Sequence, residues 1–566
     1  MDTSRTCESS EVRIDHSLSE VERQHLTRRT ETVLDCLKQH GISCSEHDMP
    51  NIAVLGSGGG LRAMVGLLGS LSRLKKEGLL DCIMYLSGVS GSTWCMASLY
   101  NGPNWSTKLE TVEDNIVQRL AEGRVSWSQM GQKLANYYAN NENFSLTDVW
   151  AALIVSNMVN EIDEHKLTEQ RANYTNDPYP IYTVIDKQCK YDTLNADVWF
   201  EITPDESGYS LSGAFVDSSC WGSQFKSGER IKDQPETDML YLQGLCGSAI
   251  ADMEENKKFL YEALKQLIEY IFGYTEERHT SQIPDVKKGQ QALLALVELN
   301  LSVIRGKDPS IYLNIIEDLL KDKYDEIGRM TLRLKKMMTS EGKMTETELQ
   351  NYNLRVCSFI TDLFRGQGSW FDMWMAIVRS LILLVSWTWG TNYDFLYRMQ
   401  VEVIDPSVLD SETRQYEDAG LLLNSPYFSV LRKERHIDLI ISLDFSAGNP
   451  FETVVTTAKL CKHLQIPFPE VVVPAEDTEP QDFYVFRGYS KAPTVIHIPL
   501  FNAVNCKGEI KQWEKRYQTF QKSYTPEMIT DLLEKAAENI KNNKEKLLKE
   551  IINIIQEKKT YKHGKM

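Results

Sequence analysis

The sequence lacks cysteines and histidines at the spacing of a metal site. Its eleven cysteines stand singly, with no CxxC pair and no Cys/His cluster. Structural zinc sites and disulfide frameworks both depend on such spacing. We therefore expect no bound metal and no cofactor, and reduced thiols in a cytoplasmic protein.

A secretion signal and a long apolar run are also missing. Residues 1–7 (MDTSRTC) do not begin a basic segment followed by an apolar one. The most apolar window, 373–389, is about the minimum length that spans a bilayer, and Arg379 interrupts it. We predict a core helix there and a cytoplasmic location.

Basic residues are outnumbered by acidic ones: 62 lysines and arginines stand against 79 aspartates and glutamates, which gives a formal net charge of −17 over 566 residues. Phosphates would be repelled at long range, which argues against nucleic acid as a partner. Membrane contact must then be local. Residues 541–566 contain eight lysines against three glutamates. The favoured interpretation of them is a solvated surface helix, and the alternative is attraction to anionic lipid.

Two glycine-containing motifs each stand between a predicted buried strand and a predicted helix. Residues 56–62 read GSGGGLR after the apolar run 52–55, and residues 88–92 read GVSGS after the apolar run 82–86. Between them, apolar residues recur at helical spacing, and Gly78 follows that pattern as a helix stop. Strand, helix and strand in this order predict a βαβ unit and a parallel sheet.

These motifs supply two parts of an acyl-transfer site. A glycine-rich loop offers backbone N–H donors for an oxyanion, and a small-x-Ser-x-small elbow exposes a nucleophilic hydroxyl, here that of Ser90. Nucleotide-binding alternatives fit less well. A P-loop needs a lysine after Gly60, and a dinucleotide fingerprint counted from Gly58 lacks the acidic residue that should end the next strand.

The base that activates Ser90 is left open by the residues themselves. A Ser-Asp-His order needs a downstream histidine, and four are available: His436, His463, His497 and His563. Alternatively, a carboxylate takes the proton directly. Asp418 in the tripeptide DAG is the candidate, because the two small residues after it allow close approach to the serine.

The organisation we predict has three parts. Residues 1–48 form a helical extension with a capping-box pattern at its start, SEVE from Ser19. Residues 49–525 form the catalytic domain. Within it, roughly 254–400 is charged, helical in spacing and poor in glycine, which is typical of a cap or lid. Residues 526–566 form a C-terminal helix and basic tail.

Together the motifs resemble the cytosolic (group IV) phospholipase A2 family, within the patatin-like lipid acyl hydrolases. The resemblance covers roughly residues 50–520 and includes the loop, the elbow and the late DAG. Further similar segments are 178–182, 199–204, 213–215, 389–391 and 444–448. It implies an α/β fold: a doubly wound, mainly parallel sheet with a helical cap or lid insertion.

The same resemblance implies roles for individual residues. Ser90 would be the nucleophile and Asp418 its general base, while Gly59 and Gly60 would donate to the oxyanion. A free carboxylate with a pKa of about 4 is a poor base for a hydroxyl, so burial must raise the pKa of Asp418.

Two arginines complete the implied site: Arg62 and Arg435 would bind the substrate, either by positioning its phosphate or by stabilising the developing charge. One position departs from the family pattern: Glu417 stands where an apolar residue is usual. We expect its carboxylate to point away from Asp418.

The predicted activity is calcium-independent hydrolysis of fatty acyl esters of glycerophospholipids through a Ser-Asp dyad. The segment before the core is too short for a calcium-binding C2 module, and no EF-hand loop is present. The partner would be phospholipid or lysophospholipid at an intracellular membrane surface, with peripheral association. The alternatives are mainly lysophospholipase or transacylase activity, or a lipid-binding structural protein with little turnover.

Overall fold

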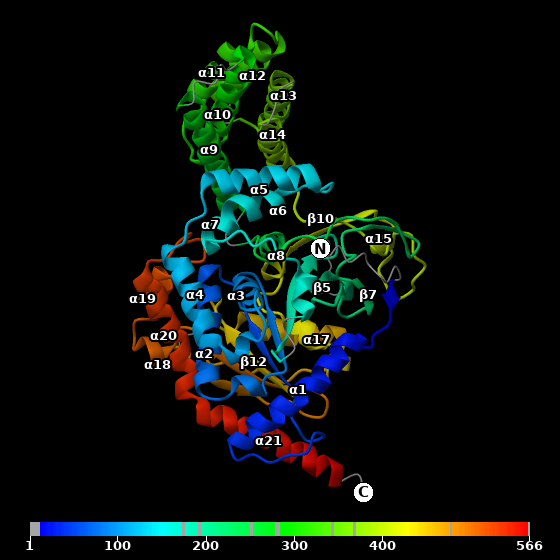
Figure 1. The fold of residues 1–566 in the computed structure, drawn as a ribbon. Coiled ribbons are helices and arrows are strands. Elements are labelled where there is room, and N and C mark those ends of the chain that lie inside the picture. The colour runs from blue at the N-terminus through cyan, green and yellow to red at the C-terminus, as the bar shows by residue number, and fades with distance from the viewer. Residues whose placement is uncertain are drawn as a thin grey trace. The chain divides into compact units, whose positions relative to one another are not determined.

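A computed structural model describes residues 12–172, 176–190, 195–249, 253–277, 283–340, 344–365, 370–475 and 478–563 (Figure 1). The chain divides into two compact units. We call residues 1–123, 158–250 and 392–566 the sheet unit, and residues 124–157 and 251–391 the helical unit.

The strands have the following bounds: β1 Arg13–Ile14, β2 Ile52–Gly56, β3 Tyr85–Gly88, β4 Tyr179–Asp186, β5 Trp199–Ile202, β6 Glu206–Tyr209, β7 Ala214–Asp217, β8 Gln224–Lys226, β9 Glu229–Lys232, β10 Thr391–Tyr393, β11 Thr413–Asp418, β12 Leu439–Asp444, β13 Tyr484–Phe486 and β14 Thr494–Pro499. The helices of the sheet unit are α1 Glu20–Gln39, α2 Leu61–Lys76, α3 Gly91–Leu99, α4 Leu109–Glu122, α8 Met239–Cys246, α15 Pro406–Leu409, α16 Tyr427–Val430, α17 Glu452–Leu464, α18 Ala503–Cys506, α19 Ile510–Arg516, α20 Pro526–Asn542 and α21 Lys544–His563. The helical unit contains α5 Trp127–Asn140, α6 Leu146–Trp150, α9 Met253–Glu277, α10 Pro284–Ile304, α11 Ser310–Leu320, α12 Glu326–Ser340, α13 Glu346–Phe364 and α14 Phe371–Ser386, and α7 Ser156–Val159 crosses the boundary between the units.

The centre of the sheet is parallel, in the order β4, β3, β2, β12, β14. Antiparallel strands extend it on both sides: β13 beyond β14, and β5, β6, β7 and β1 beyond β4. Strand β11 also pairs antiparallel with β4. The predicted α/β class with parallel core strands is confirmed, and the antiparallel extensions add to it.

Burial explains why the central strands are apolar along their whole length. Every residue of β2 and β3 is buried, as expected for parallel strands that helices cover on both faces. Helix α2 is buried over most of its length, and it lies so close to α20 that a Cβ on Gly69 would come 2.6 Å from the Leu533 carbonyl oxygen. The predicted βαβ unit from strand 52–56 to strand 85–88 is present.

Helix α1 begins at the predicted capping residue. The Ser19 side chain accepts a hydrogen bond from the Glu22 amide at 3.1 Å. Polar residues on the inner face of α1 are buried, and the Tyr85 hydroxyl of β3 donates to Glu22 at 2.8 Å. The helix therefore packs against the sheet through polar contacts as well as apolar ones.

The helical unit has its own core. Asn300 of α10 and Asn353 of α13 are buried and donate to each other through their side-chain amides, at 2.7 and 2.9 Å. Helix α14 covers most of the apolar window 373–389 and is largely buried, which confirms the predicted core helix. Among the described residues, no helix is both long and apolar enough to cross a bilayer.

Nine cysteines of the described residues are free thiols, and all of them except Cys44 are buried. The expectation of reduced thiols is confirmed for these nine. It is wrong at Cys220, which is disulfide-bonded.

Candidate active site

Ser90 lies in the tight turn between β3 and α3. Its backbone has φ +52° and ψ −122°, a strained conformation for a residue with a side chain. Small neighbours permit this turn, because a Cβ on Gly91 would lie 1.9 Å from the Gly60 carbonyl oxygen and one on Gly88 would lie 2.8 Å from the Met96 sulfur. The turn has the geometry of the predicted nucleophile elbow.

The glycine loop connects β2 to α2 and borders Ser90. Its first two amides are used: Ser57 donates to the Leu443 carbonyl at 3.1 Å, and Gly58 donates to the Asn424 carbonyl at 3.2 Å. In the described part of the chain, the amides of Gly59 and Gly60 donate no hydrogen bond. Two free donors at the amino end of a helix suit a developing negative charge.

Asp418 is the last residue of β11 and pairs with Val184 of β4. Its carboxylate is completely buried, with Oδ1 accepting from the Gly420 amide at 2.8 Å and Oδ2 from the Ala249 amide at 3.1 Å. Burial raises the pKa of Asp418 to about 6, against the opposing effects of these two amides and of a hydrogen bond from the Ser90 hydroxyl. The carboxylate therefore lies within reach of Ser90 and is more basic than an ordinary aspartate.

Glu417 points away from this site, as predicted, because successive strand residues face opposite sides of a sheet. Its carboxylate lies 2.8 Å from the Lys190 ammonium and 3.5 Å from that of Lys187. Its charge raises the pKa of Asp418, but by less than burial does.

Arg62 is buried beside the glycine loop. Its guanidinium donates to the carbonyls of Phe445 at 2.7 Å and Tyr517 at 2.6 Å, and to the Thr519 hydroxyl at 3.0 Å. No carboxylate forms an ion pair with it among the described residues. A Cβ on Gly59 would lie 2.8 Å from its Nη2, so a buried positive charge lies next to the free amides.

Arg435 lies at the other end of the sheet, where its carbonyl accepts from the Asn51 side chain just before β2 begins. All its N–H groups are occupied: the contacts are two bonds to Glu22, two to Glu201 and one to the Ser429 carbonyl. The structure thus brings Ser90, Gly59, Gly60, Asp418 and Arg62 together and places Arg435 apart from them. Phosphate binding by Arg435 stays a prediction, and it would require exchange of these partners.

The histidine alternative finds no geometric support. His497 is buried in β14, where its ring nitrogens contact the Pro450 carbonyl at 2.6 Å and the Ser442 hydroxyl at 3.2 Å. His463 lies in the last turn of α17, and His436 lies before β12. Within the described residues, no histidine hydrogen-bonds Ser90 or Asp418; the side chain of His563 lies outside them.

Asn424 is a site residue that the sequence analysis missed. Its side-chain amide donates to the Gly58 carbonyl at 3.1 Å and to the Ser446 hydroxyl at 2.8 Å. It thereby joins the glycine loop to the segments that follow β11 and β12. A lone asparagine four residues after the DAG carries no motif, so a single sequence offers no signal for it.

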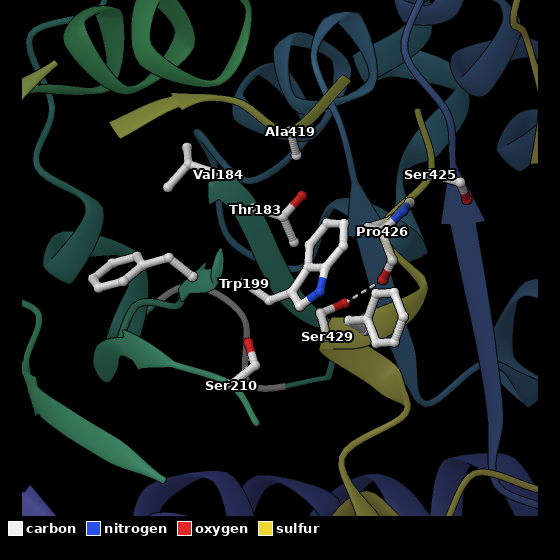
Figure 2. A pocket seen from close by; sticks show the side chains of 10 residues that line it. Thr183, Val184, Trp199, Ser210, Ala419, Ser425, Pro426 and Ser429 are labelled. Atoms are coloured by element: carbon white, nitrogen blue, oxygen red, sulfur yellow. Dashed lines mark hydrogen bonds between the residues drawn. The ribbon is translucent and has the colours of Figure 1, made fainter. Parts of the chain in front are cut away.

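A small cavity lies in the sheet unit, lined by residues of β4 and β5, by Ser210 and by residues between Ala419 and Ser429 (Figure 2). Figure 2 shows Trp199 and Ser429 beside it, with Ser429 donating to the Pro426 carbonyl at 2.7 Å. It has room for about one water molecule and is too small for a lipid.

The described residues contain no group of acidic, cysteine or histidine side chains that could hold a metal ion.

A hydroxyl on a strained elbow, two free loop amides and a buried carboxylate meet at the carboxyl ends of parallel strands. This fold and site define the class of α/β acyl hydrolases. Comparison with known sequences narrows the class. Residues 52–272 match the lysophospholipase catalytic domain family.

Two curated relatives are similar over nearly the whole chain. Cytosolic phospholipase A2 gamma of Mus musculus is 34% identical over 576 residues, covering 94% of this chain and 91% of the relative. Cytosolic phospholipase A2 gamma of Homo sapiens is 34% identical over 556 residues, covering 96% and 97%. The chain belongs to the cytosolic phospholipase A2 family, which confirms the predicted family and the predicted class of enzyme, an esterase.

A solved structure agrees on the fold. Human GIVD cytosolic phospholipase A2 superposes with a TM-score of 0.66 at 21% identity, covering 97% of this chain and 69% of that one.

Proposed function

We propose that this protein hydrolyses the fatty acyl esters of glycerophospholipids through a dyad of Ser90 and Asp418. The observation that carries the proposal is the buried carboxylate of Asp418, whose pKa of about 6 and reach to Ser90 suit a general base near neutral pH. Family membership supports phospholipid as the substrate class.

The reaction has two halves. In the first, Asp418 takes the proton of Ser90 as Oγ attacks the ester carbonyl carbon, and the amides of Gly59 and Gly60 stabilise the oxyanion. The ester C–O bond breaks, and the leaving lysophospholipid oxygen takes the proton from Asp418. In the second half, water attacks the acyl-enzyme, and its proton returns through Asp418 to Ser90.

Calcium has no assigned part in this proposal. The chain's own groups supply the nucleophile, the base and the oxyanion donors, so we infer that turnover continues without the ion.

We also propose peripheral association of a cytoplasmic protein with intracellular membranes, because the substrate lies in a bilayer surface. The helical unit remains our proposal for the predicted cap.

A second candidate within the same chemistry is lysophospholipase or transacylase activity. The match of residues 52–272 to a lysophospholipase catalytic domain favours it specifically. The two candidates share the acyl-enzyme and differ in which ester enters and which acceptor leaves with the acyl group.

The test is release of labelled fatty acid from phospholipid and lysophospholipid vesicles in excess chelator. We expect activity in the wild type and a loss of at least about a thousandfold in Ser90→Ala and Asp418→Asn, as for other nucleophile and base removals. Loss of wild-type activity in chelator would refute the calcium independence. A folded wild type that releases no fatty acid from either lipid would refute the enzyme and favour a lipid-binding protein.

A further inference from the structure

Asn424 presents a side-chain carbonyl oxygen to the active site. Its Nδ2 faces the Gly58 carbonyl, which can only accept, so the amide cannot be turned round without losing that bond. The second bond, to the Ser446 hydroxyl, holds the side chain beside the loop. Among the described residues Oδ1 accepts no hydrogen bond, and the side chain is only partly buried.

This oxygen lies close to both members of the dyad. A Cβ on Gly58 would lie 2.3 Å from Asn424 Oδ1 and 2.9 Å from the Ser90 Cβ. These two distances together place Oδ1 within about 5.2 Å of the Ser90 Cβ. In the same way, a Cβ on Gly420 would lie 2.9 Å from Oδ1 and 3.0 Å from Asp418 Oδ1, which bounds the distance between the two oxygens at about 5.9 Å. Both distances are upper limits, and one water molecule with two hydrogen bonds of about 2.8 Å joins oxygens up to about 5.6 Å apart.

The base alone does not orient a water molecule. Both Asp418 oxygens already accept from backbone amides, and a water donates only one of its two hydrogens to the base. The other hydrogen needs an acceptor if the water is to keep one direction of attack. An alcohol acceptor has a single hydroxyl hydrogen and gains nothing from a second acceptor.

We propose that Asn424 Oδ1 accepts a hydrogen bond from the water that attacks the acyl-enzyme, and so directs the acyl group to water in preference to alcohols. The inference rests on the proposed dyad. In the step, a bond forms between the water oxygen and the acyl carbon, and the bond from that carbon to Ser90 Oγ breaks. One water proton passes through Asp418 to Ser90 Oγ; the other stays on the product acid and is the one that Asn424 holds.

The experiment measures the fate of the acyl group when phospholipid vesicles are supplied with excess glycerol. Asn424→Ala should lower fatty acid release about tenfold, the loss expected for one orienting hydrogen bond of about 1.4 kcal/mol, while acyl transfer to glycerol stays within about threefold. Labelling of Ser90 by a fluorophosphonate should stay within about threefold, because the Gly58 amide still donates to the Asn424 backbone carbonyl.

Ser446→Ala is the second variant. It removes one of the two bonds that orient the amide and leaves Asn424 in place, so we expect the same shift toward transfer at a smaller size, even if Asn424→Ala does not fold. Parallel loss of hydrolysis, transfer and labelling would overturn the proposal, since Asn424 would then act only on the oxyanion loop. An unchanged ratio of products would overturn it too. Failure of the proposed function is distinct: the wild type would yield neither product, or Ser90→Ala would yield both.

Discussion

Burial of Asp418 should lower the stability of the folded protein in a pH-dependent way. Its pKa rises from 3.8 to about 6 on folding, and one pKa unit corresponds to about 1.4 kcal/mol, so the ionised carboxylate costs about 3 kcal/mol. The unfolded chain ionises first as the pH rises, so the cost is absent below pH 3.8 and complete above pH 6. By linkage, roughly half of this cost has already developed at pH 5.

Asp418→Asn removes this cost and leaves a neutral side chain of the same shape. One of the two backbone amides then loses its acceptor, which costs about 1–3 kcal/mol at every pH. The informative quantity is therefore how the difference in free energy of unfolding between variant and wild type changes with pH. Relative to the wild type, the free energy of unfolding of Asp418→Asn should rise by about 1.5 kcal/mol between pH 5 and pH 8.

Calorimetric melting of both proteins at several pH values between 5 and 8 measures this difference. Ser90→Ala is the matched control, because it removes activity but keeps the carboxylate. We expect the melting temperature of Asp418→Asn to rise relative to the wild type as the pH rises, and no comparable trend in the control. A flat or reversed trend would show that Asp418 is not a desolvated carboxylate, and would remove the reason for assigning it as the base.

Three further predictions concern the same site. The kcat/KM for a soluble ester should fall about tenfold per pH unit below pH 6 and level off above it, since Asp418 must be ionised to act; a profile with no limb near 6 would contradict its role. Gly91→Ala should abolish fluorophosphonate labelling, because the new Cβ would overlap the Gly60 carbonyl at 1.9 Å, whereas Gly273→Ala, with open space around it, should label normally. Arg435→Met should destabilise the protein by about 3–5 kcal/mol, because buried Glu22 loses its ion pair and buried Glu201 keeps only Arg432 as an ion partner. A normal melting temperature together with a raised KM for phospholipid, but not for a neutral ester, would instead support the predicted phosphate contact.

The sequence predicted those parts of the site that are local in the chain. The elbow at Ser90 and the loop at Gly59 and Gly60 each combine a strand, small residues and a helix within about ten positions, so pattern and steric argument were sufficient. Glu417 could be placed because alternation along a strand is a local rule. The residues offer Asp418 only as an alternative to four histidines, and the family resemblance is what selects it, since the tripeptide alone predicts little.

What the sequence could not predict depends on contacts between distant segments. The partners of Arg435 come from α1, β5 and α16, and nothing near residue 435 indicates that they use every donor of its guanidinium. The antiparallel extensions of the sheet, such as β5 to β7, likewise follow from pairing that short strands do not encode. Asn424 belongs to this group as well.

The contacts of Asn424 also bear on how the site forms. The glycine loop follows β2, Asp418 ends β11 and Ser446 follows β12. Strand β2 lies hundreds of residues before the other two strands, and Asn424 bonds to the glycine loop and to Ser446. In the free loop, the Gly58 amide and carbonyl would turn toward water; here both are held by one residue. The proposed oxyanion donors, the amides of Gly59 and Gly60, would therefore be oriented only after β11 and its following turn have packed against the parallel strands. Activity should thus appear late in refolding, after the sheet has formed, because loop-closure entropy delays contacts between distant segments.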